Sequence, residues 1–397
     1  MPKKSAPLKT AKRNLKRPTV LLGLGWYAAA LHRGIARYAG QAGWILDIRM
    51  LRSGHPPAYW EGDGIICSLR MDSNLDRLAE NASMPVVNVG NLVHPRIPHV
   101  SSDNAAVGRL AAEYFLQRGF KNFAFFYRSG SLGERARADA FRQRIREAGW
   151  RMHEMNWPVS SKTLSDQERD SRLIGWLSGQ VASLPKPVAV FSEYDDFAVE
   201  VLNACKSGDS LVPEQVAVLG VGDDPLRCEF APVPLSSIDD DEELIGYEAA
   251  ALLGRLMKKE RVPKDPILIA PRAVTTRLST DILAVEHPLV ASALRTIWDH
   301  YTEPIGAKQI AATVPMSYRR LHDAFVRYVG HSIPDEIARK RLELARKLLE
   351  ESDKKTTEIA WLCGFTDHDR MGKVFKRVMD VTPTAYRRRF KNPDAAA

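Results

Sequence analysis

Hydrophobic positions along the chain follow two different patterns, and the pattern changes between residues 280 and 290. Before this point, short apolar runs alternate with longer segments in which apolar residues recur at helical spacing. The runs predicted as strands are TVLLGLG (19–25), WILDIRM (44–50), GIICSL (64–69), PVVNVG (85–90), NFAFFY (122–127), VAVFS (188–192), VAVLGVG (216–222) and ILIAP (267–271). The segments predicted as helices are 31–40, 105–119, 135–149, 198–205 and 243–259.

Several of these strands are nearly continuous runs of Val, Ile and Ala, which is typical of parallel strands covered on both faces. Alternation of strand and helix at this spacing predicts right-handed crossovers and a doubly wound α/β fold. Because residues 18–280 exceed the usual size of one domain, we expect two linked α/β lobes. Gly119, Gly149 and Gly208 follow predicted helices, as C-cap glycines do.

From about residue 290 the pattern is helical, with apolar residues at intervals of three and four. The predicted helices are 289–301, 305–314, 318–330, 335–352, two within IAWLCGFTDHDRMGKVFKRV (359–378), and 384–390. Pro334 stands at the first turn of its helix, where a missing N–H costs nothing. The sequence therefore predicts an all-α domain after the α/β part.

This helical part repeats itself at an offset of 49 residues at its front and 50 at its back. The matching positions are Ile310, Ala311, Leu321, Phe325 and Gly330 in the first copy and Ile359, Ala360, Met371, Phe375 and Asp380 in the second. Each copy is typical of a short helix, a tight turn and a second helix that crosses the first. A duplicated helix–turn–helix is far more specific than one copy alone.

The local chemistry of each copy fits this motif. Gly364 permits the positive φ that returns the chain after the first helix, and Ser317 and Asp367 are placed as N-caps of the second helices. The second helices bury their apolar residues on one face and present polar ones on the other. Helix 335–352 is about 27 Å long at 1.5 Å per residue, which can set these two helices roughly one duplex turn, ~34 Å, apart.

The polar faces predict a DNA interface in the major groove. Arg can bind guanine, Asp can accept a hydrogen bond from cytosine, and the other cations can neutralise phosphates. The candidate DNA-binding residues on these faces are Tyr318, Arg319, Arg320, His322, His368, Asp369, Arg370 and Lys373, with the cap Ser317 beside them. The alternative is a helical bundle with a solvated polar face, which the duplication and the excess of basic residues disfavour.

Charge supports this interpretation. The chain carries a net charge of +9, and residues 1–17 contain seven Lys and Arg and no acidic residue. Residues 291–397 contain 20 Lys and Arg against 14 Asp and Glu. A basic end on a mildly acidic body indicates a polyanionic partner. Residues 1–17 can also be no more than a solvated, disordered arm, because Lys with Ala, Pro and Ser cannot form a core.

Composition excludes several classes of protein. The chain has 397 residues, 45% of them hydrophobic, and no apolar run long enough to cross a bilayer. VLLGLG (20–25) is too short for a secretory signal, so we expect a cytoplasmic protein without a membrane partner. Four scattered cysteines have no metal-ligand spacing, and we expect neither metal nor cofactor. The motifs of phosphate-binding loops, dinucleotide-binding enzymes, serine hydrolases and zinc proteases are absent, so we expect no enzyme.

The helical part resembles the AraC-type transcription regulators. Residues 358–390, EIAWLCGFTDHDRMGKVFKRVMDVTPTAYRRRF, carry the IA pair, the GF turn, the F-K pair and the TP-x-x-Y-R ending of the second motif of that family. By resemblance, the base-reading positions are Arg319, His322 and Asp323, and then His368, Asp369, Gly372 and Lys373. Gly372 has no side chain to read a base, and Pro315 stands where the first copy usually has glycine.

Residues 18–280 resemble the periplasmic-binding-protein-like sensor domain (type I) of sugar-responsive regulators. The stretches that carry this resemblance are GIICSL, PVVNVG, 100–126, RARADAFRQRIREAG (135–149) and VPEQVAVLGVGDD (212–224). The resemblance implies a cleft between two lobes with Arg137, Asp195 and Asp223 binding sugar hydroxyls and Tyr194 nearby. Gly222 replaces an aspartate of the family, and Tyr194 replaces a common Asn. We expect Asp103 to be a helix N-cap instead of a ligand.

Together the two halves have the layout of the xylose-operon regulator group. The layout implies a basic tail (1–17), an effector domain (18–280), a linker (281–290) and an AraC-type DNA-binding domain (291–392). We expect promoter DNA and a small sugar, first a xylose-like pentose, as partners of a homodimer, with RNA polymerase as a further candidate partner. A different carbohydrate, a non-sugar effector, and a vestigial sensor with ligand-independent DNA binding remain open as alternatives.

Overall fold

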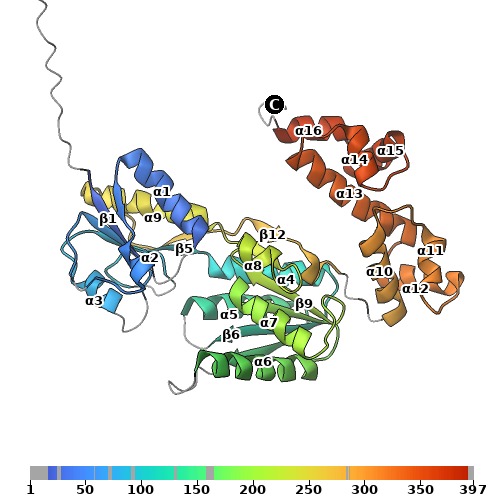
Figure 1. Ribbon diagram of the computed structural model, residues 1–397, viewed down its shortest axis with the longest axis horizontal. Coiled ribbons are helices and arrows are strands. Elements are labelled where there is room, and N and C mark those ends of the chain that lie inside the picture. Colours follow the sequence, from blue (N-terminus) through green and yellow to red (C-terminus); the bar gives the residue numbers. More distant parts are fainter. Residues whose placement is uncertain are drawn as a thin grey trace, which may run out of the picture.

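The computed structural model contains two α/β lobes followed by a part made of helices (Figure 1). The structure describes residues 17–24, 28–57, 59–69, 74–90, 94–128, 132–157, 165–282, 285 and 287–391. Apart from Arg17, the predicted basic tail lies outside the described residues, as do residues 283, 284 and 286 of the predicted linker. The predicted fold class, a two-lobed α/β domain followed by an all-α domain with two helix–turn–helix units, is confirmed.

The first lobe, called the N-lobe, is built on a parallel sheet in the order β2-β1-β3-β4. Its strands are β1 (Thr19–Gly23), β2 (Ile45–Asp47), β3 (Gly64–Cys67) and β4 (Val86–Asn88). The parallel pair β5 (Val100–Ser102) and β11 (Ile267–Ile269) adjoins β4 through a bridge between Asn88 and His99. Helices α1 (Ala29–Ala42) and α9 (Glu242–Met257) pack on one face of the sheet, and α2 (Arg49–Ser53) and α3 (Asn74–Glu80) on the other.

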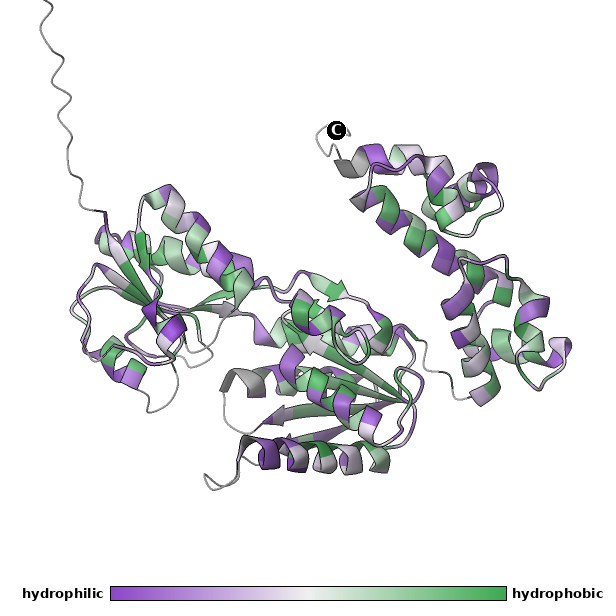
Figure 2. Cartoon of the chain, in the orientation of Figure 1, coloured by the Kyte–Doolittle hydropathy of each residue, from purple (hydrophilic) through white to green (hydrophobic). Residues whose placement is uncertain are grey.

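The second lobe, called the C-lobe, has a sheet in the order β12-β10-β9-β8-β6-β7, parallel except for β12. Its strands are β6 (Asn122–Arg128), β7 (Met152–Trp157), β8 (Val188–Ser192), β9 (Val216–Val221), β10 (Ser236–Asp239) and β12 (Ala273–Thr275). Helices α4 (Asn104–Gln117) and α5 (Leu132–Glu147) cover one face, and α6 (Asp166–Ser183) and α7 (Asp195–Ser207) the other. Figure 2 shows the inner strands of this sheet as mostly hydrophobic, as expected for strands covered on both faces.

The chain passes between the lobes in segments that lie side by side. Strand β5 leads into α4 at Asp103, β10 leads into α9 through Asp240 and Asp241, and β11 leads into β12 through Arg272. The backbone N–H of Asp103 donates to the carbonyl of Ile269 at 2.7 Å, and that of Arg272 donates to Asp239 at 2.8 Å. The side chain of Arg272 also contacts the Asp241 carboxylate at 2.9 Å. These crossings are the places where one lobe can turn against the other.

The helical part contains two small cores that share one long helix. Its helices are α10 (Pro288–His300), α11 (Ala307–Ala312), α12 (Tyr318–Val329), α13 (Ile333–Glu351), α14 (Thr356–Leu362), α15 (His368–Met379) and α16 (Pro383–Lys391). The first core joins α10, α11, α12 and the start of α13, and the second joins the rest of α13 with α14, α15 and α16. Helix α10 begins at Pro288, inside the segment that the sequence predicted to be a linker.

Some sequence-based predictions of single elements were wrong. Residues 49 and 50, predicted as the end of a strand, begin α2. Helix α6 was not predicted, although Ser165 and Glu168 form a capping box at its start. Strand β7 was not predicted either; its sequence, MHEMNW, lacks a regular alternation, and it is the edge strand of its sheet. By contrast, Gly208 is the C-cap of α7 as the sequence predicted, although its φ is negative and the left-handed residue is the following Asp209.

Candidate nucleic-acid interface and effector site

The second helix of each motif, α12 or α15, begins at the cap that the sequence predicted. The side chain of Ser317 accepts a hydrogen bond from the backbone N–H of Arg320, and Asp367 accepts one from the N–H of Arg370 at 2.6 Å. At the other end, Gly330 and Asp380 both take a left-handed conformation, with φ of 88° and 56°. Gly330 and Asp380 therefore end their helices in the same conformation, which glycine adopts more readily than aspartate.

The two helices also bury the same positions. Leu321 and Phe325 in α12 and Met371 and Phe375 in α15 are fully buried. From 318 to 330 and from 368 to 380, the order of buried, half-buried and exposed residues is identical. Because the buried pairs hold each helix against its own small core, the remaining polar positions of both helices face solvent in equivalent ways.

The candidate DNA-binding side chains are on these outer surfaces. Exposed positions are Ser317, Tyr318, Arg319, Arg320, Asp323, His368, Asp369, Arg370 and Lys373, whereas His322 and Gly372 are half-buried. Within the described residues, the cations among them form no ion pair: Arg319, Arg320, Arg370 and Lys373. Charges that form no ion pair are available to phosphates or bases without breaking a protein contact.

Some of the candidate side chains contact their neighbours. The ring of His322 lies 6.3 Å from that of Tyr318, one turn earlier in α12. In α15, Nε2 of His368 is 3.2 Å from the Thr356 hydroxyl and Nδ1 is 3.6 Å from the Asp369 carboxylate. Asp369 is 90% exposed, so its carboxylate can still accept from a cytosine amino group.

The orientation of the second motif relative to the first is fixed by a tight contact at Gly364. This residue has φ of 78°, and a Cβ there would lie 2.5 Å from the carbonyl oxygen of Thr302, in the loop after α10. Arg341 of α13 holds the same loop, because its Nε donates to the carbonyl of Tyr301 at 2.6 Å and its NH2 to that of Glu303 at 2.7 Å. Figure 1 shows α15 near one end of α13 and α12 near the other, both in the helical part of the chain.

The predicted effector residues lie at the C-lobe side of the junction between the lobes. Arg137 is within the second turn of α5 and is 2% exposed. Its Nε and NH2 donate to the Asn104 side chain at 3.1 and 2.7 Å, its NH1 donates to the carbonyl of Glu193, and its Cζ is 5.2 Å from the Tyr194 ring centre. A guanidinium has five N–H groups, so Arg137 retains donors beyond these three bonds.

Asp195, by contrast, is engaged with the protein. It begins α7 and is 2% exposed, and its carboxylate accepts from the Ser237 hydroxyl at 2.6 Å and from the N–H of Asp224 at 3.1 Å. Burial raises the pKa of Asp195 to about 6 in spite of these hydrogen bonds. The carboxylate ties α7 to the loop after β9 and to β10.

Asp223 is engaged as well. Its carboxylate accepts from NH1 of Arg277 at 2.7 Å and from the Thr275 hydroxyl at 2.6 Å, both beside β12. Asp223 has φ of 49° and follows Gly222, whose φ is 121°. The structure therefore brings Arg137 and Tyr194 together, while Asp195 and Asp223 serve contacts within the C-lobe.

Sequence reasoning missed Asp240 in the crossing between β10 and α9. Its Oδ2 is 3.8 Å from NH2 of Arg137, and its Oδ1 has no hydrogen-bond partner among the described residues although Asp240 is 6% exposed. Burial, outweighing the favourable charge of Arg137, raises the pKa of this carboxyl. Nearby, burial and the charge of Asp240 raise the pKa of Glu242 to about 8. The run of three aspartates at 239–241 was the signal in the sequence, but it did not say which would be buried.

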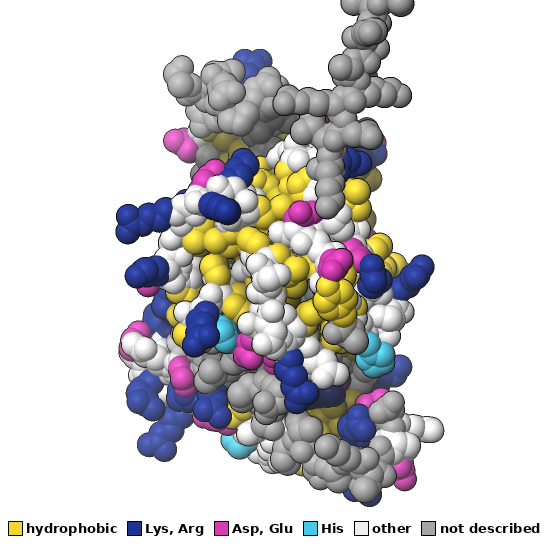
Figure 3. Space-filling view, turned by 90° about the vertical axis from the view of Figure 1, so that its left-hand side faces the viewer, with side chains coloured by type: hydrophobic (Ala, Val, Ile, Leu, Met, Phe, Trp, Pro, Cys, Tyr) yellow, Lys and Arg dark blue, Asp and Glu magenta, His cyan; other side chains and the backbone are white. Residues whose placement is uncertain are grey.

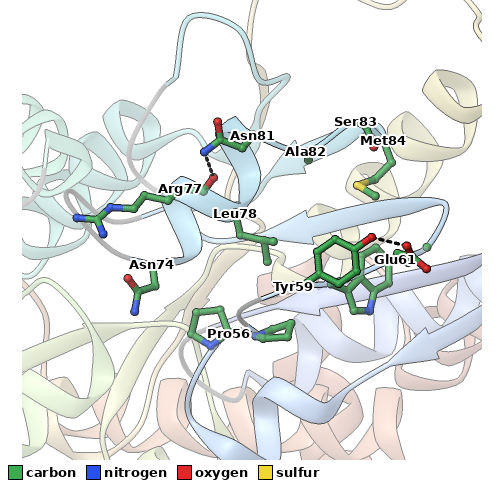
Figure 4. Close-up of a pocket in the computed structure, with 13 residues that line it drawn as sticks. Pro56, Tyr59, Glu61, Asn74, Arg77, Leu78, Asn81, Ala82, Ser83 and Met84 are labelled. Atoms are coloured by element: carbon green, nitrogen blue, oxygen red, sulfur yellow. Dashed lines mark hydrogen bonds between the residues drawn. The ribbon is translucent and has the colours of Figure 1, made fainter.

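A separate groove of about 750 Å³ opens on the N-lobe, away from these residues. Figure 4 shows Pro56 and Tyr59 on one side of this groove and Leu78 and Arg77 on the other. The face of the molecule at the N-lobe end displays apolar side chains between basic ones (Figure 3). The groove lies between α3 and the loop before β3, so it does not include the lobe junction.

The described residues show no metal cluster, no membrane-spanning helix and no exposed thiol. Within the described residues, His, Cys, Asp and Glu form no cluster that could hold a metal ion. In the same part of the chain, every helix is too short or too polar to cross a membrane. The four cysteines are buried as free thiols, and burial raises the pKa of Cys205 to about 11.

Comparison with protein families matches both halves of the chain. Residues 112–280 match the periplasmic binding protein-like domain, and residues 310–389 match a helix-turn-helix domain. These ranges contain Arg137 and Tyr194 and the second helices of both motifs, α12 and α15.

Comparison with single proteins matches the whole arrangement. The xylose operon regulatory protein of Escherichia coli (strain K12) is 31% identical over 83% of this chain and 84% of its own. That of Haemophilus influenzae (strain ATCC 51907 / DSM 11121 / KW20 / Rd) is 28% identical over 82% of this chain and 84% of its own. The solved structure of the xylose-binding transcription activator xylR is 28% identical, with a TM-score of 0.68 over 94% of this chain and 98% of its own.

Proposed function

Because the chain belongs to the family of xylose operon regulatory proteins, we propose that it is a transcription regulator whose binding to promoter DNA is controlled by a small sugar between its lobes. The observation that carries this proposal is the pair of reading helices, α12 and α15, with identical burial patterns and unpaired cations on their outer surfaces. A bundle whose polar face served only for solubility would not need to repeat the same exposed positions.

We propose that α12 and α15 enter successive major grooves. Helix α13 has 19 residues, about 28 Å at 1.5 Å per residue, which is near the ~34 Å of one duplex turn. Arg319, His322 and Asp323 then face base edges in one groove, and His368 and Asp369 in the next, where Lys373 reaches either a base edge or a phosphate. Ser317, Tyr318, Arg320 and Arg370, at the ends of the same helices, are placed for phosphates.

For the effector we propose a xylose-like pentose that contacts Arg137, Tyr194 and Asp240. Arg137 has remaining donors, Asp240 has a buried oxygen without a partner, and the Tyr194 ring offers an apolar face to sugar C–H groups. Asp195 and Asp223 support this site from behind, because their carboxylates are bound within the C-lobe. The effector domain is then 18–280 and the DNA-binding domain 291–392.

We further propose that two copies act together on DNA in the cytoplasm and that RNA polymerase is contacted from the bound state. A homodimer would let closure of each sensor change the distance between two DNA-binding domains. The relatives are transcription regulators, and we propose no enzymatic role for this chain. Light scattering on the full chain tests the dimer, which a monomeric mass at micromolar concentration would contradict.

The experiment that tests the proposed function is a titration of the full chain against a labelled promoter fragment of a xylose-utilisation operon, with and without D-xylose. We expect binding with a steep salt dependence and a change of affinity on addition of the sugar. A matched titration with L-arabinose and D-glucose separates a pentose sensor from one for another carbohydrate. Specific binding that no sugar alters would support the vestigial sensor, and an absence of specific binding would contradict the proposal.

A further inference from the structure

The helical part is attached to the C-lobe by more than the chain that links them. Ile282 is 5% exposed and packs in a core of the C-lobe, and Val285 is 7% exposed and packs in the first helical core. Three residues of extended chain span at most about 10 Å. The two cores are therefore direct neighbours, and the chain between them is too short to let them move far apart.

An ion pair between a buried lysine and a half-buried aspartate joins the two parts at this place. The ammonium of Lys340, in the middle of α13, contacts both carboxylate oxygens of Asp281 at 2.6 and 2.8 Å. The side chain of Lys340 is only 7% exposed, although lysine is rarely buried unless it is paired. Its ammonium also lies 4.5 Å from the centre of the Trp298 ring, in the range of a cation–π contact.

Trp298 contacts both sides of the joint. Its ring packs against the C-lobe core that contains Ile282 and against the first helical core. Its indole N–H donates to the Glu336 carboxylate at 2.6 Å, and this fully buried group also binds His331 and Arg339. The network fixes the Trp298 ring relative to α13, so Trp298 and Lys340 meet the C-lobe as one unit.

A second ion pair lies on different elements. Arg295 of α10 contacts Glu214, just before β9, at 2.8 Å. One contact alone would leave the helical part free to turn about it, whereas two contacts with a packed ring between them fix its orientation. Both contacts end on the C-lobe, and Figure 1 shows the helical part beside this lobe and away from the N-lobe.

We propose that Lys340, Asp281 and Trp298 lock the first helix–turn–helix motif to the C-lobe, so that effector-driven rotation between the lobes moves the reading helices together with the C-lobe. The inference rests on the proposed function, since it says how a sugar-induced closure reaches DNA. Lys340 is here a positioning residue: it lies on α13 and belongs to neither reading helix. Without the lock, the linking chain and the Arg295–Glu214 contact remain, and the helical part can turn about that single contact whatever the state of the sensor.

The test uses the full-length variants Lys340→Met and Asp281→Asn. For each, DNA affinity is measured with and without D-xylose, and sugar binding is measured by calorimetry. We expect sugar affinity to stay unchanged, while the ratio of the two DNA affinities, about 5- to 150-fold for typical coupling, falls toward one. The control Lys354→Met removes an exposed pair with Glu358 in the same domain and should keep the ratio.

Two further measurements keep the outcome decisive. The double exchange of Asp281→Lys with Lys340→Asp should restore part of the ratio if the pair itself matters. Hydrogen exchange along α10 should rise in Lys340→Met and not in Lys354→Met. A ratio and an exchange rate that both stay as in the wild type overturn the lock. If the wild type shows no response to D-xylose, the proposed function is at fault, and exchange along α10 alone decides about the lock.

Discussion

Gly364 occupies a position that an ordinary side chain cannot take. Its φ is 78°, and a Cβ would lie 2.5 Å from the Thr302 carbonyl oxygen. We expect Gly364→Ala to lower the free energy of unfolding by about 1–3 kcal/mol, because both a left-handed conformation and a backbone contact must be accommodated. Urea unfolding of the full chain measures this.

Gly372 gives the matched control for this prediction. It lies within α15, and a Cβ there would meet nothing within 4 Å. Gly372→Ala should leave stability unchanged or raise it by up to about 1 kcal/mol, since alanine favours the helix. If both variants lose the same stability, the contact with Thr302 does not matter.

Arg319 and Lys373 separate the two ways in which an exposed cation can bind DNA. If Arg319 reads a base, Arg319→Ala should cost about 1–3 kcal/mol of binding free energy and relax specificity at one position. If Lys373 contacts phosphate, Lys373→Ala should weaken binding to all sequences and reduce the salt slope by about one. Fluorescence anisotropy at several salt concentrations measures both, with Lys206→Ala, on the sensor, as the control. Unchanged binding in both variants would reject the groove assignment.

The raised pKa of Asp195 predicts how the free energy of unfolding depends on pH. Its pKa of about 6 lies above the usual 3.8 because it is buried, so the folded chain holds this proton more tightly than the unfolded chain does. The ionised form is the less stable one when folded, and stability from this group falls as pH rises from about 4 to above 6. The fall amounts to about 3 kcal/mol, as an order of magnitude.

The variant Asp195→Asn should lack this decrease in the free energy of unfolding with rising pH. In unfolding by urea between pH 4.5 and 7, its stability relative to the wild type should therefore rise with pH. The Ser237 hydroxyl, which now donates to Oδ1, can accept from the new amide. Asp139→Asn, on the exposed side of α5, is the control and should follow the wild type. A constant difference between Asp195→Asn and the wild type would show that Asp195 does not titrate in this range.

At the scale of elements, Arg341 holds the two motifs in one orientation. Its guanidinium binds the carbonyls of Tyr301 and Glu303, and this loop contacts Gly364 of the second motif. A lysine can reach only part of this arrangement, because it lacks the planar fork. We expect Arg341→Lys to weaken binding to DNA with both half-sites by about 1 kcal/mol and to leave binding to a single half-site unchanged.

Competition binding with one-box and two-box DNA measures this difference. Arg346→Lys, on the same helix, changes a weak exposed contact with Glu350 at 3.9 Å and is the control. Equal losses on both kinds of DNA would mean that Arg341 acts within one motif and not between the two.

The elements that the sequence predicted best were those whose own residues determine them. The caps at Ser317 and Asp367, the positive φ of Gly364 and the N-cap Asp103 depend on nearby backbone groups, and all four are confirmed. Helix α6 was missed although the capping box at Ser165 and Glu168 is a local signal. Strand β7 was missed because its residues do not alternate regularly between apolar and polar, so its conformation depends on pairing with β6. Likewise, partners far along the chain decide which carboxylate at the lobe junction is left without a hydrogen bond. Arg277, for example, binds Asp223. Asp195 and Asp223, which are bound within the C-lobe, were therefore predicted from the sequence, whereas Asp240 was missed.

At the scale of the whole molecule, the sensor and the DNA-binding domain share the C-lobe. Arg137 faces the junction from this lobe, and Lys340 and Arg295 hold the reading helices on its other side. The N-lobe joins it through the crossings at Asp103, Asp240 and Arg272. A ligand that binds the closed form more tightly than the open form shifts the balance between them by that difference in affinity and no more.

Because Arg137 lies at the junction between the lobes, it should determine how much a bound sugar stabilises the chain. A sugar at 100 times its dissociation constant stabilises the folded chain by about 2.7 kcal/mol, which raises the melting temperature by about 5–10 °C. Arg137→Ala should abolish this rise, because it removes the guanidinium that retains donors for the sugar. Arg142→Ala, on the same helix but paired outward with Glu154, should retain the rise. Because Arg137→Ala also lowers the starting melting temperature, the measured quantity is the rise at saturating D-xylose. A full rise in Arg137→Ala would move the sugar away from the junction, and the Asp240 and Tyr194 assignments would be lost with it.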